Sequence, residues 1–282
     1  FLGLPASGKT FTACHLAAGI AVRTGKKKPV AFYDSEGGSD YVQHLFEKAG
    51  VELLVVKSRS FSDLILAMKE AQESCCALVI DSITHPWIEV CESYLAKVNE
   101  ERLAKGWKKI DRMEFQHWNY LKKLWRTQFT EPYLNSPLHI FMCGRLGYEY
   151  EYQEKDGKKE LVKGDIKMKA EAELGYEPSV LIEMERVFDE EGKMHHRAIV
   201  LKDRFDLLNG KTFIDPKFSD LAPIWEHIQL GKETLPVGIA VDTSRSSTAM
   251  LESPPIPDDN RKMQKKILNE EIDSLLLSAF PG

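Results

Sequence analysis

The segment GLPASGKT, from Gly3 to Thr10, decides how this 282-residue chain folds. It matches the pattern G-x-x-x-x-G-K-[ST] at every fixed position, and residues 11–24, rich in Ala, Leu and Ile, follow it without a proline. A glycine-rich turn directly before a helix presents backbone N–H groups and the positive end of the helix to an anion. The sequence therefore predicts a phosphate-binding loop followed by a helix.

The fixed residues of this segment have distinct expected roles. Lys9 is expected to reach the β and γ oxygens of a nucleoside triphosphate, and the hydroxyl of Thr10 is expected to coordinate Mg²⁺. The candidate nucleotide-contacting residues are Gly3, Pro5, Ala6, Ser7, Gly8, Lys9, Thr10 and Phe11.

Short apolar stretches alternate with helical patterns along the rest of the chain. Strands are expected at 29–33, 52–57, 77–80 and 138–143, and helices at 41–49 and 62–74. This alternation is typical of crossover units in a mostly parallel sheet. Residues 180–188 and 195–202, separated by a turn, predict two antiparallel strands at the sheet edge. The predicted fold class is α/β.

The chain is expected to divide into three regions. Residues 1–240 form the main domain, and its first strand is interpreted as truncated because so little precedes the glycine-rich loop. A helical insertion is expected at about 85–131, with a break at Lys105–Gly106. Residues 241–260 have the composition of a linker, and residues 261–282 predict an amphipathic helical tail.

Composition excludes several classes of protein. No stretch approaches the roughly 18 apolar residues of a membrane span, and the N-terminus lacks a secretory pattern. The five cysteines form no CxxC pair, which argues against structural zinc and a disulfide framework. A net charge of -5 argues against a generally basic nucleic-acid coat, so any DNA contact must be regional. We expect a cytoplasmic protein without a membrane partner.

Two carboxylates follow predicted strands. Asp81 ends the apolar run LVIDS, where a carboxylate for the Mg²⁺ site belongs relative to the loop. Glu36 ends the run AFYDSE and is the candidate for the base that orients an attacking water. The alternative for Glu36 is an exposed carboxylate at a strand end.

The order of these motifs along the chain, with the glycine-rich loop first, Glu36 next and Asp81 last, resembles that of the RecA-like ATPases. This division includes recombinases, hexameric replicative helicases and KaiC-type proteins. In that division the catalytic glutamate ends the strand after the P-loop helix, as Glu36 does in YDSEGG. The metal-site aspartate ends a V-I-D-S strand, as Asp81 does. The resemblance implies a RecA-like P-loop NTPase core, ATP and Mg²⁺ as cofactors, and a homo-oligomeric ring or filament.

The resemblance extends to three cations. Lys202 and Arg204 follow the strand RAIVLKDR, where family members carry a Lys/Arg pair that reaches the γ-phosphate bound by the neighbouring subunit. A cation arriving in trans stabilises the transferring phosphoryl group and makes hydrolysis depend on assembly. Solvation of a strand end is the alternative. The family commonly has a polar sensor, often Gln, after the fourth core strand, and Arg145 of IFMCGR is expected to substitute as a γ-phosphate sensor.

A narrower resemblance covers residues 1 to about 225. The motifs YDSEGG, LVIDSIT, GYEYEY and KMKAEAELGYEP, with a strand of LIEMER type, look like those of phage-encoded RecA-like proteins of single-strand annealing recombination. This implies ATP-dependent recombination or annealing on single-stranded DNA. It also implies a single-strand-binding protein or another recombination partner, in a bacterial or phage-infected cell.

Two segments are candidates for DNA contact. Residues 102–126 carry eight basic residues against two acidic ones, interleaved with three tryptophans, and cations beside aromatic faces suit single strands. The helical spacing of Trp118, Leu121 and Trp125 equally suits a core face, which would leave the lysines as a solvated surface. Residues 147–169 predict an exposed loop or hairpin. Within it, residues 155–169 carry six lysines and three acids and either contact DNA or are merely solvated.

Two other functions fit the same core. A helicase or DNA-translocating motor would couple DNA-stimulated turnover to unwinding. An ATP-gated protein-interaction switch would use its basic segments on acidic partners and would bind no DNA at low salt. The adjacent His195 and His196 point to opposite faces of a predicted strand, cannot share one metal, and are interpreted as structural.

Overall fold

The computed structural model describes residues 1–155 and 158–231, with the backbone alone described for 149–155 and 158–166. The predicted linker at 241–260 and the predicted tail at 261–282 lie outside the described residues, as does the predicted domain end at residue 240. Of the helices in the described ranges, none is both long enough and apolar enough to cross a membrane.

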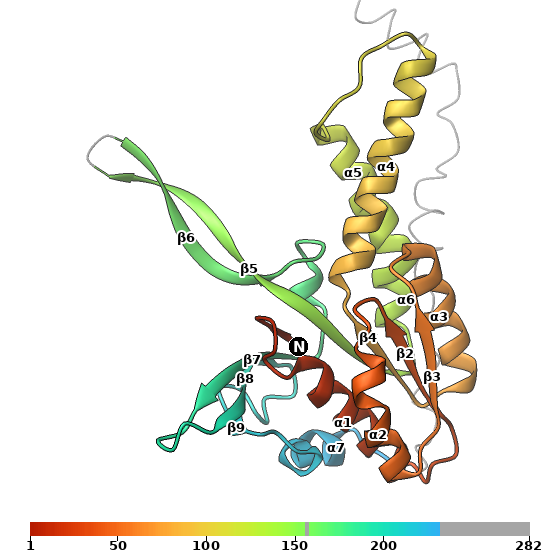
Figure 1. Cartoon of the computed structure of the whole chain (residues 1–282), viewed down its shortest axis with the longest axis vertical. Coiled ribbons are helices and arrows are strands. Elements are labelled where there is room, and N and C mark those ends of the chain that lie inside the picture. Colours follow the sequence, from red (N-terminus) through yellow and green to blue (C-terminus); the bar gives the residue numbers. More distant parts are fainter. Residues whose placement is uncertain (156–157, 232–282) are drawn as a thin grey trace, which may run out of the picture. The chain divides into compact units, whose positions relative to one another are not determined.

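The described residues are organised around a nine-stranded sheet, in the order β3-β2-β4-β5-β1-β7-β8-β9, with β6 paired to β5 alone (Figure 1). The strands are β1 (Leu2–Gly3), β2 (Val30–Asp34), β3 (Leu53–Lys57), β4 (Ala77–Asp81), β5 (His139–Lys155), β6 (Lys158–Met168), β7 (Val180–Phe188), β8 (Met194–Asp203) and β9 (Thr212–Ile214). Pairing is parallel from β3 to β7 and antiparallel at β6, β8 and β9. The predicted α/β class with a mostly parallel sheet is confirmed.

Helices cover both faces of this sheet. They are α1 (Lys9–Arg23), α2 (Ser39–Ala49), α3 (Phe61–Ser74), α4 (Thr84–Ala104), α5 (Phe115–Trp125), a π-helix (Arg126–Thr130), α6 (Glu131–Leu134) and α7 (Ala222–His227), with 3-10 turns at Leu174–Tyr176 and Phe218–Leu221. The segment from α4 to the π-helix corresponds to the predicted helical insertion. Its break falls where predicted, because α4 ends before Lys105 and Gly106 has a φ of 74°, outside the helical region.

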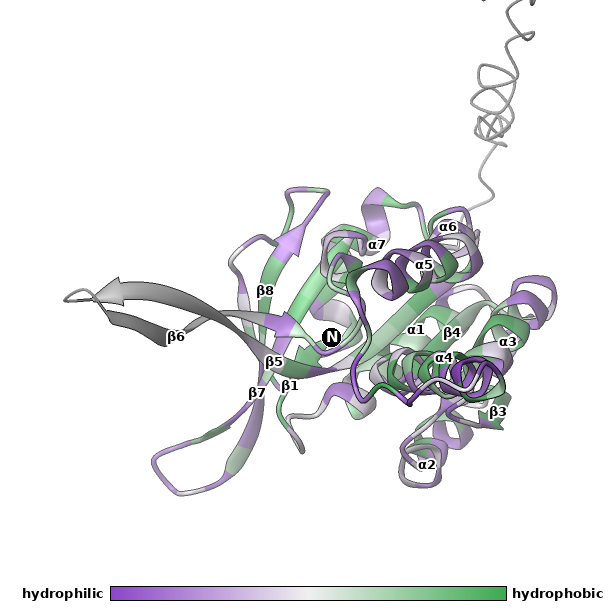
Figure 2. Cartoon of the chain, turned by 90° about the horizontal axis from the view of Figure 1, so that it is seen from above, coloured by the Kyte–Doolittle hydropathy of each residue, from purple (hydrophilic) through white to green (hydrophobic). Residues whose placement is uncertain are grey.

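The central strand β4 shows why the sheet is buried on both sides. Ala77 and Val79 pack into the cluster formed with α1 and α2, whereas Leu78 and Ile80 pack into the cluster formed with α3 and α5. Successive side chains of a strand point to opposite faces, so a continuous apolar run serves two cores. Colouring by hydropathy shows the same distribution, with hydrophobic residues along α1 and β4 (Figure 2).

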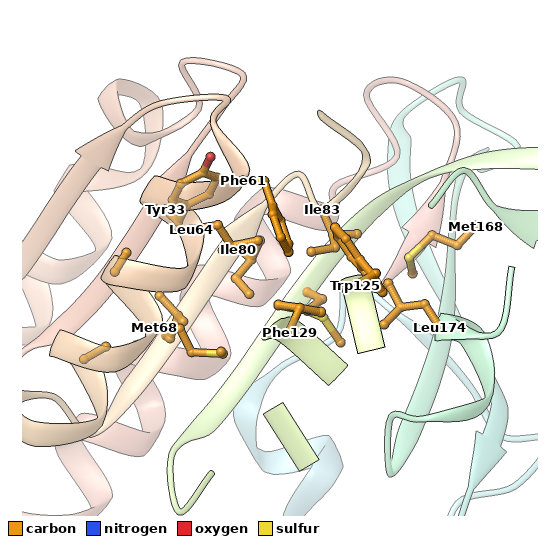
Figure 3. Close-up of a cluster of buried hydrophobic side chains, with 14 of the residues drawn as sticks. Tyr33, Phe61, Leu64, Met68, Ile80, Ile83, Trp125, Phe129, Met168 and Leu174 are labelled. Atoms are coloured by element: carbon orange, nitrogen blue, oxygen red, sulfur yellow. The ribbon is translucent and has the colours of Figure 1, made fainter. Parts of the chain in front are cut away.

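Trp125 is at the centre of the second cluster (Figure 3). It is 1% exposed, and its ring centroid lies 5.0 Å from that of Phe61 and 4.9 Å from that of Phe129. Leu121 is equally buried, whereas Trp118 remains 38% exposed. The core interpretation is therefore confirmed for Leu121 and Trp125, and Trp125 cannot stack on a DNA base.

Trp125→Ala is expected to lower the free energy of unfolding by about 3–5 kcal/mol, because the cavity left by a buried tryptophan is only partly filled by its neighbours. Urea denaturation followed by circular dichroism measures the change. Trp107→Ala is the matched control, since Trp107 is 56% exposed and an exposed substitution shifts stability by about 0.5 kcal/mol or less. A similar small loss for Trp125→Ala would contradict its place in the core.

Two sequence predictions need correction. The strand expected to end at residue 143 continues as β5 to Lys155 and pairs with β6 from Leu146↔Met168 to Lys155↔Lys158. Of the two alternatives predicted for the following segment, loop or hairpin, the hairpin is confirmed. The continuation could not be predicted from an apolar pattern, because the added residues are mostly polar. Backbone pairing with β6 extends the strand there. The second correction concerns β8, which is not the edge strand because β9 pairs beyond it.

Candidate functional site

Five of the predicted site residues, Lys9, Thr10, Glu36, Asp81 and Arg145, converge where the parallel strands end. Because β2, β4 and β5 are in register at Asp34, Asp81 and Cys143, the segments that follow them leave the same edge of the sheet. The glycine-rich loop (residues 4–8) follows β1 at this edge. Gly38 marks how closely the segments meet, since a Cβ there would lie 3.1 Å from both the Asp81 Oδ2 and the Thr10 Cγ2.

The glycine-rich loop ends at a helix start that has no side-chain cap. Gly8 is the N-cap of α1, has a φ of 89°, and is followed by a first turn without an acidic residue. The first N–H groups of a helix have no partner within the helix, so this end favours an anion. A side chain at Gly8 would also collide with the ring of His196, 2.5 Å from the added Cβ.

Lys9 folds back over the same loop. Its Nζ donates to the carbonyl oxygens of Gly3 at 3.0 Å and Leu4 at 2.9 Å. Burial lowers the pKa of Lys9, while Asp81 and Glu36 are among the groups that oppose this shift. A partly desolvated ammonium group beside free helix amides can neutralise a bound phosphate.

Thr10 and Asp81 form a pair of oxygen ligands. The Thr10 hydroxyl donates to the Asp81 Oδ2 at 2.5 Å, and Asp81 is 2% exposed. Burial raises the pKa of Asp81 to about 6, an effect that the Thr10 hydrogen bond opposes. A hydroxyl and a carboxylate are hard ligands of the kind that hold Mg²⁺ together with phosphate oxygens. The residues present therefore fit the predicted metal, which would also relieve the cost of the buried charge.

The turn after β2 is built around Asp34, whose role was not foreseen from the sequence. Its Oδ1 accepts from the backbone N–H groups of Glu36, Gly37 and Gly38 at 2.7–3.1 Å, and its Oδ2 accepts from the N–H and hydroxyl of Ser39. Although burial acts to raise the pKa of Asp34, these hydrogen bonds lower it overall. The run D-S-E-G-G-S carried the signal, because an aspartate caps a following turn in this way.

Glu36 and Arg145, predicted as base and sensor, contact each other. The Glu36 Oε1 accepts from the Arg145 Nε at 3.0 Å and from the Ser82 hydroxyl at 2.8 Å. Burial acts to raise the pKa of Glu36, but the hydrogen bonds from Ser82 and Arg145 lower it overall. Glu36 is therefore ionised near neutral pH, as a general base must be.

A pocket of about 640 Å³ adjoins the glycine-rich loop. It is lined on one side by α1 and on the others by α2 and the segment after β9, including Phe11, His15, Lys48, His196, Asp215 and Phe218. His196 joins pocket and loop, because its ring packs on Gly8. Sequence patterning had suggested only a structural role for this residue. Its neighbour His195 does have structural contacts, since its ring nitrogens lie 2.6 Å from Asp215 and 3.0 Å from Asp189.

Lys202 and Arg204 are not part of this convergence. Both donate to the carbonyl oxygen of Tyr176 at 2.6 Å. Strand β8 runs antiparallel to β7, so its last residues lie beside the start of β7, and Lys202 pairs with Leu181. The glycine-rich loop instead leaves β1 beside Met184. The two cations therefore belong to a different part of the surface from Lys9 of the same chain.

The converging groups supply what phosphoryl transfer to water requires: amides and a lysine for the phosphates, oxygen ligands for a metal, and an ionised carboxylate for the water. No model of a known protein family matches the sequence, and no curated protein matches it either.

Proposed function

We propose that the chain is a Mg²⁺-dependent ATPase of the RecA-like P-loop type that binds single-stranded DNA as a homo-oligomer and acts in DNA recombination or annealing. The observation that carries the ATPase assignment is the meeting of three segments at one sheet edge. There the uncapped start of α1, the Thr10–Asp81 pair at 2.5 Å, and Glu36 lie together. The DNA substrate rests on the sequence resemblance and on the surface of the helical insertion.

Each residue has one task in this function. The backbone amides at the start of α1 and Lys9 bind the phosphates. Thr10 and Asp81 would hold Mg²⁺, which when bound supplies charge neutralisation on the phosphate oxygens. Glu36 accepts a hydrogen bond from the attacking water and orients it. Lys202 and Arg204 complete the site of a neighbouring subunit, which accounts for their separation from the loop of their own chain.

The pocket beside the loop suits the nucleoside. Its volume of about 640 Å³ is within the range of ligand pockets, and its lining includes Phe11 and His196, whose ring packs on Gly8. The rings of Phe11 and His15 stack on one wall at 6.4 Å, and Asp215 and Lys217 supply polar groups. A base bound there would leave its phosphates at the start of α1.

The segment between α4 and α5, in the helical insertion, has features that suit single-strand binding. Trp107 is exposed, and the charged ends of Arg102 and Lys105 lie 5.6 and 5.5 Å from its ring centroid. The segment is not loose, because the Asn99 side chain exchanges two hydrogen bonds with the backbone of Ile110, at 2.8 and 3.0 Å. A rigid aromatic face among cations suits a base stacked beside neutralised phosphates.

Three measurements on the purified chain test this function. Calorimetry with ATP and Mg²⁺ should register binding, and phosphate release should follow. A labelled oligonucleotide should bind with an affinity that falls steeply between two salt concentrations. Annealing of complementary strands without unwinding separates the proposal from a motor. Nucleotide binding with no DNA binding at low salt would instead favour the protein-interaction switch.

Trp107→Ala is expected to weaken oligonucleotide binding by about 1–3 kcal/mol, the contribution of one stacked base. Lys108→Gln combined with Lys109→Gln should weaken binding and also reduce its salt dependence. The slope of log affinity against log salt concentration should become shallower by roughly 0.7 for each phosphate that the lysines no longer neutralise. Fluorescence anisotropy at several salt concentrations measures both. Tyr41→Ala, which is 80% exposed on α2, and Lys27→Gln with Lys69→Gln are matched controls. Equal losses in the controls would contradict a DNA surface at this position.

A further inference from the structure

The carboxylate of Glu36 is anchored through one oxygen. Oε1 accepts from the Ser82 hydroxyl at 2.8 Å and the Arg145 Nε at 3.0 Å, and the His85 Nε2 lies 4.0 Å away. Among the described side chains, those of residues 1–148 and 167–231, no hydrogen bond reaches Oε2. One oxygen is thus held by two donors, while the other keeps its capacity to accept a hydrogen bond from a proton donor.

The donors behind Glu36 are themselves buried and fixed. Ser82 is 1% exposed, and its backbone N–H donates to the Ser35 Oγ at 2.8 Å. The Ser35 Oγ also lies 2.8 Å from the His85 Nδ1, with both side chains largely buried. A satisfied buried network of this kind is rigid, because each group that moved would lose a partner in a low-dielectric environment. Ser82 is therefore held in place from strand β4, the turn after β2 and helix α4.

Arg145 is the second donor to Glu36 and brings a charge. It lies on β5, and its backbone N–H donates to the Thr84 hydroxyl at 3.1 Å, which fixes the backbone at the start of α4. Its side chain is 51% exposed, so the ion pair with Glu36 is partly solvated. A charged donor at this distance orients a carboxylate more firmly than a neutral one does.

We propose that Ser82 and Arg145 are positioning residues for Glu36, supported by Ser35 and His85, and that they fix Oε1 so that Oε2 accepts a hydrogen bond from the attacking water. This rests on the proposed function, in which Glu36 orients that water. It assigns Arg145 a role through Glu36, in place of direct contact with the γ-phosphate. A carboxylate free to rotate would present either oxygen, and errors of about 1 Å in such a group cost on the order of a hundredfold in rate.

Ser82→Ala and Arg145→Gln are the test variants, assayed for ATP hydrolysis and for ATP binding. Each should lower kcat roughly ten- to a hundredfold, while the dissociation constant for ATP stays within about twofold. Ser93→Ala is the matched control, because its hydroxyl donates to Glu89 at 2.6 Å on the exposed side of α4. Ser93→Ala also removes a hydrogen bond between a serine and a glutamate, but away from Glu36, and should leave kcat unchanged.

The pH profile separates positioning from a merely structural role. Glu36 is faced by Arg145, His85, Lys9 and Asp81, and the hydrogen bonds from Ser82 and Arg145 hold its pKa below the usual value. In Arg145→Gln the pKa of Glu36 rises, less of it is ionised in mild acid, and the acid limb of kcat moves to higher pH. Arg145→Lys keeps the charge, so its acid limb should stay nearer that of the original chain although kcat falls.

Combination with Glu36→Gln decides the question. If Ser82 and Arg145 act through Glu36, adding either substitution to Glu36→Gln causes no further loss of kcat. Losses that multiply would overturn the proposal, as would a weakening of ATP binding relative to ADP in Arg145→Gln, which is the signature of a γ-phosphate sensor. Full activity of Glu36→Gln alone would instead refute the role of Glu36 in the proposed function.

Discussion

Lys9→Ala is expected to abolish ATP hydrolysis and to weaken nucleotide binding. The Lys9 ammonium group folds over the glycine-rich loop, within 3.0 Å of the Gly3 and Leu4 carbonyl oxygens. Without the Lys9 ammonium group, bound phosphates would still contact the amides at the start of α1. They would lose the one side-chain cation of this loop. The loss of a preorganised charge at a phosphoryl group costs on the order of 10²–10³ in rate. Calorimetry with Mg²⁺ and ATP, and phosphate release, measure the two effects.

Lys27→Ala provides the control for charge removal, because Lys27 is exposed beyond the opposite end of α1. It should leave both measurements unchanged. A Lys9→Ala chain that hydrolyses ATP at the original rate would refute the assignment of residues 3–10 as a phosphate-binding loop. Retained secondary structure in circular dichroism would show that any loss arises at the site.

Arg204→Ala should lose ATP hydrolysis while it still binds nucleotide, with a fall in kcat of roughly 10³–10⁵, as for cations supplied to a neighbouring site. The physical reason is that Arg204 lies away from the glycine-rich loop of its own chain, so it is expected to act at the loop of a neighbouring subunit. Arg204 and Lys202 hydrogen-bond to Tyr176 near the start of β7, away from Lys9 of their own chain. Mixing Arg204→Ala with Glu36→Gln subunits should restore part of the activity, since some interfaces then join an intact Glu36 to an intact Arg204.

The control mixture contains Arg204→Ala and a chain with both substitutions, so no interface has an intact Arg204. It should remain inactive at the same total concentration. If well-mixed oligomers of the two single variants also fail to regain activity, the cations do not act in trans. Normal hydrolysis by Arg204→Ala alone would remove it from the mechanism altogether.

Local patterns in the sequence were sufficient for the central part of the fold. Strand β4 could be predicted because Ala77–Ile80 is a short apolar run, and α1 because residues 11–24 are rich in apolar residues and contain no proline. The hairpin was ambiguous for the opposite reason. The Tyr- and Glu-rich residues of β5 beyond Arg145 have no apolar core signal, and their strand conformation depends on pairing with β6, which local propensity does not report.

The candidate site shows the same division. Lys9, Thr10, Glu36 and Asp81 could be proposed because each follows a strand or a motif with a known spacing. The contact of Arg145 with Glu36 could not, because it joins residues 109 positions apart in the sequence. His196 was missed for a similar reason, since its packing on Gly8 depends on the place of β8 in the sheet. Such contacts are set by tertiary register, which a single sequence reveals only through the fold.

Strand β5 has a mechanical consequence for the site. One uninterrupted backbone runs from His139, in the buried sheet, through Arg145 to Lys155 in the hairpin, 17 residues in all (Figure 1). At about 3.3 Å per residue, this is a lever on the order of 50 Å long, and its pairing with β6 shifts register between Tyr148 and Tyr150. We expect a displacement of the outer arm to be transmitted along the strand toward Arg145, whose guanidinium contacts Glu36, and the irregularity to be where the strand bends.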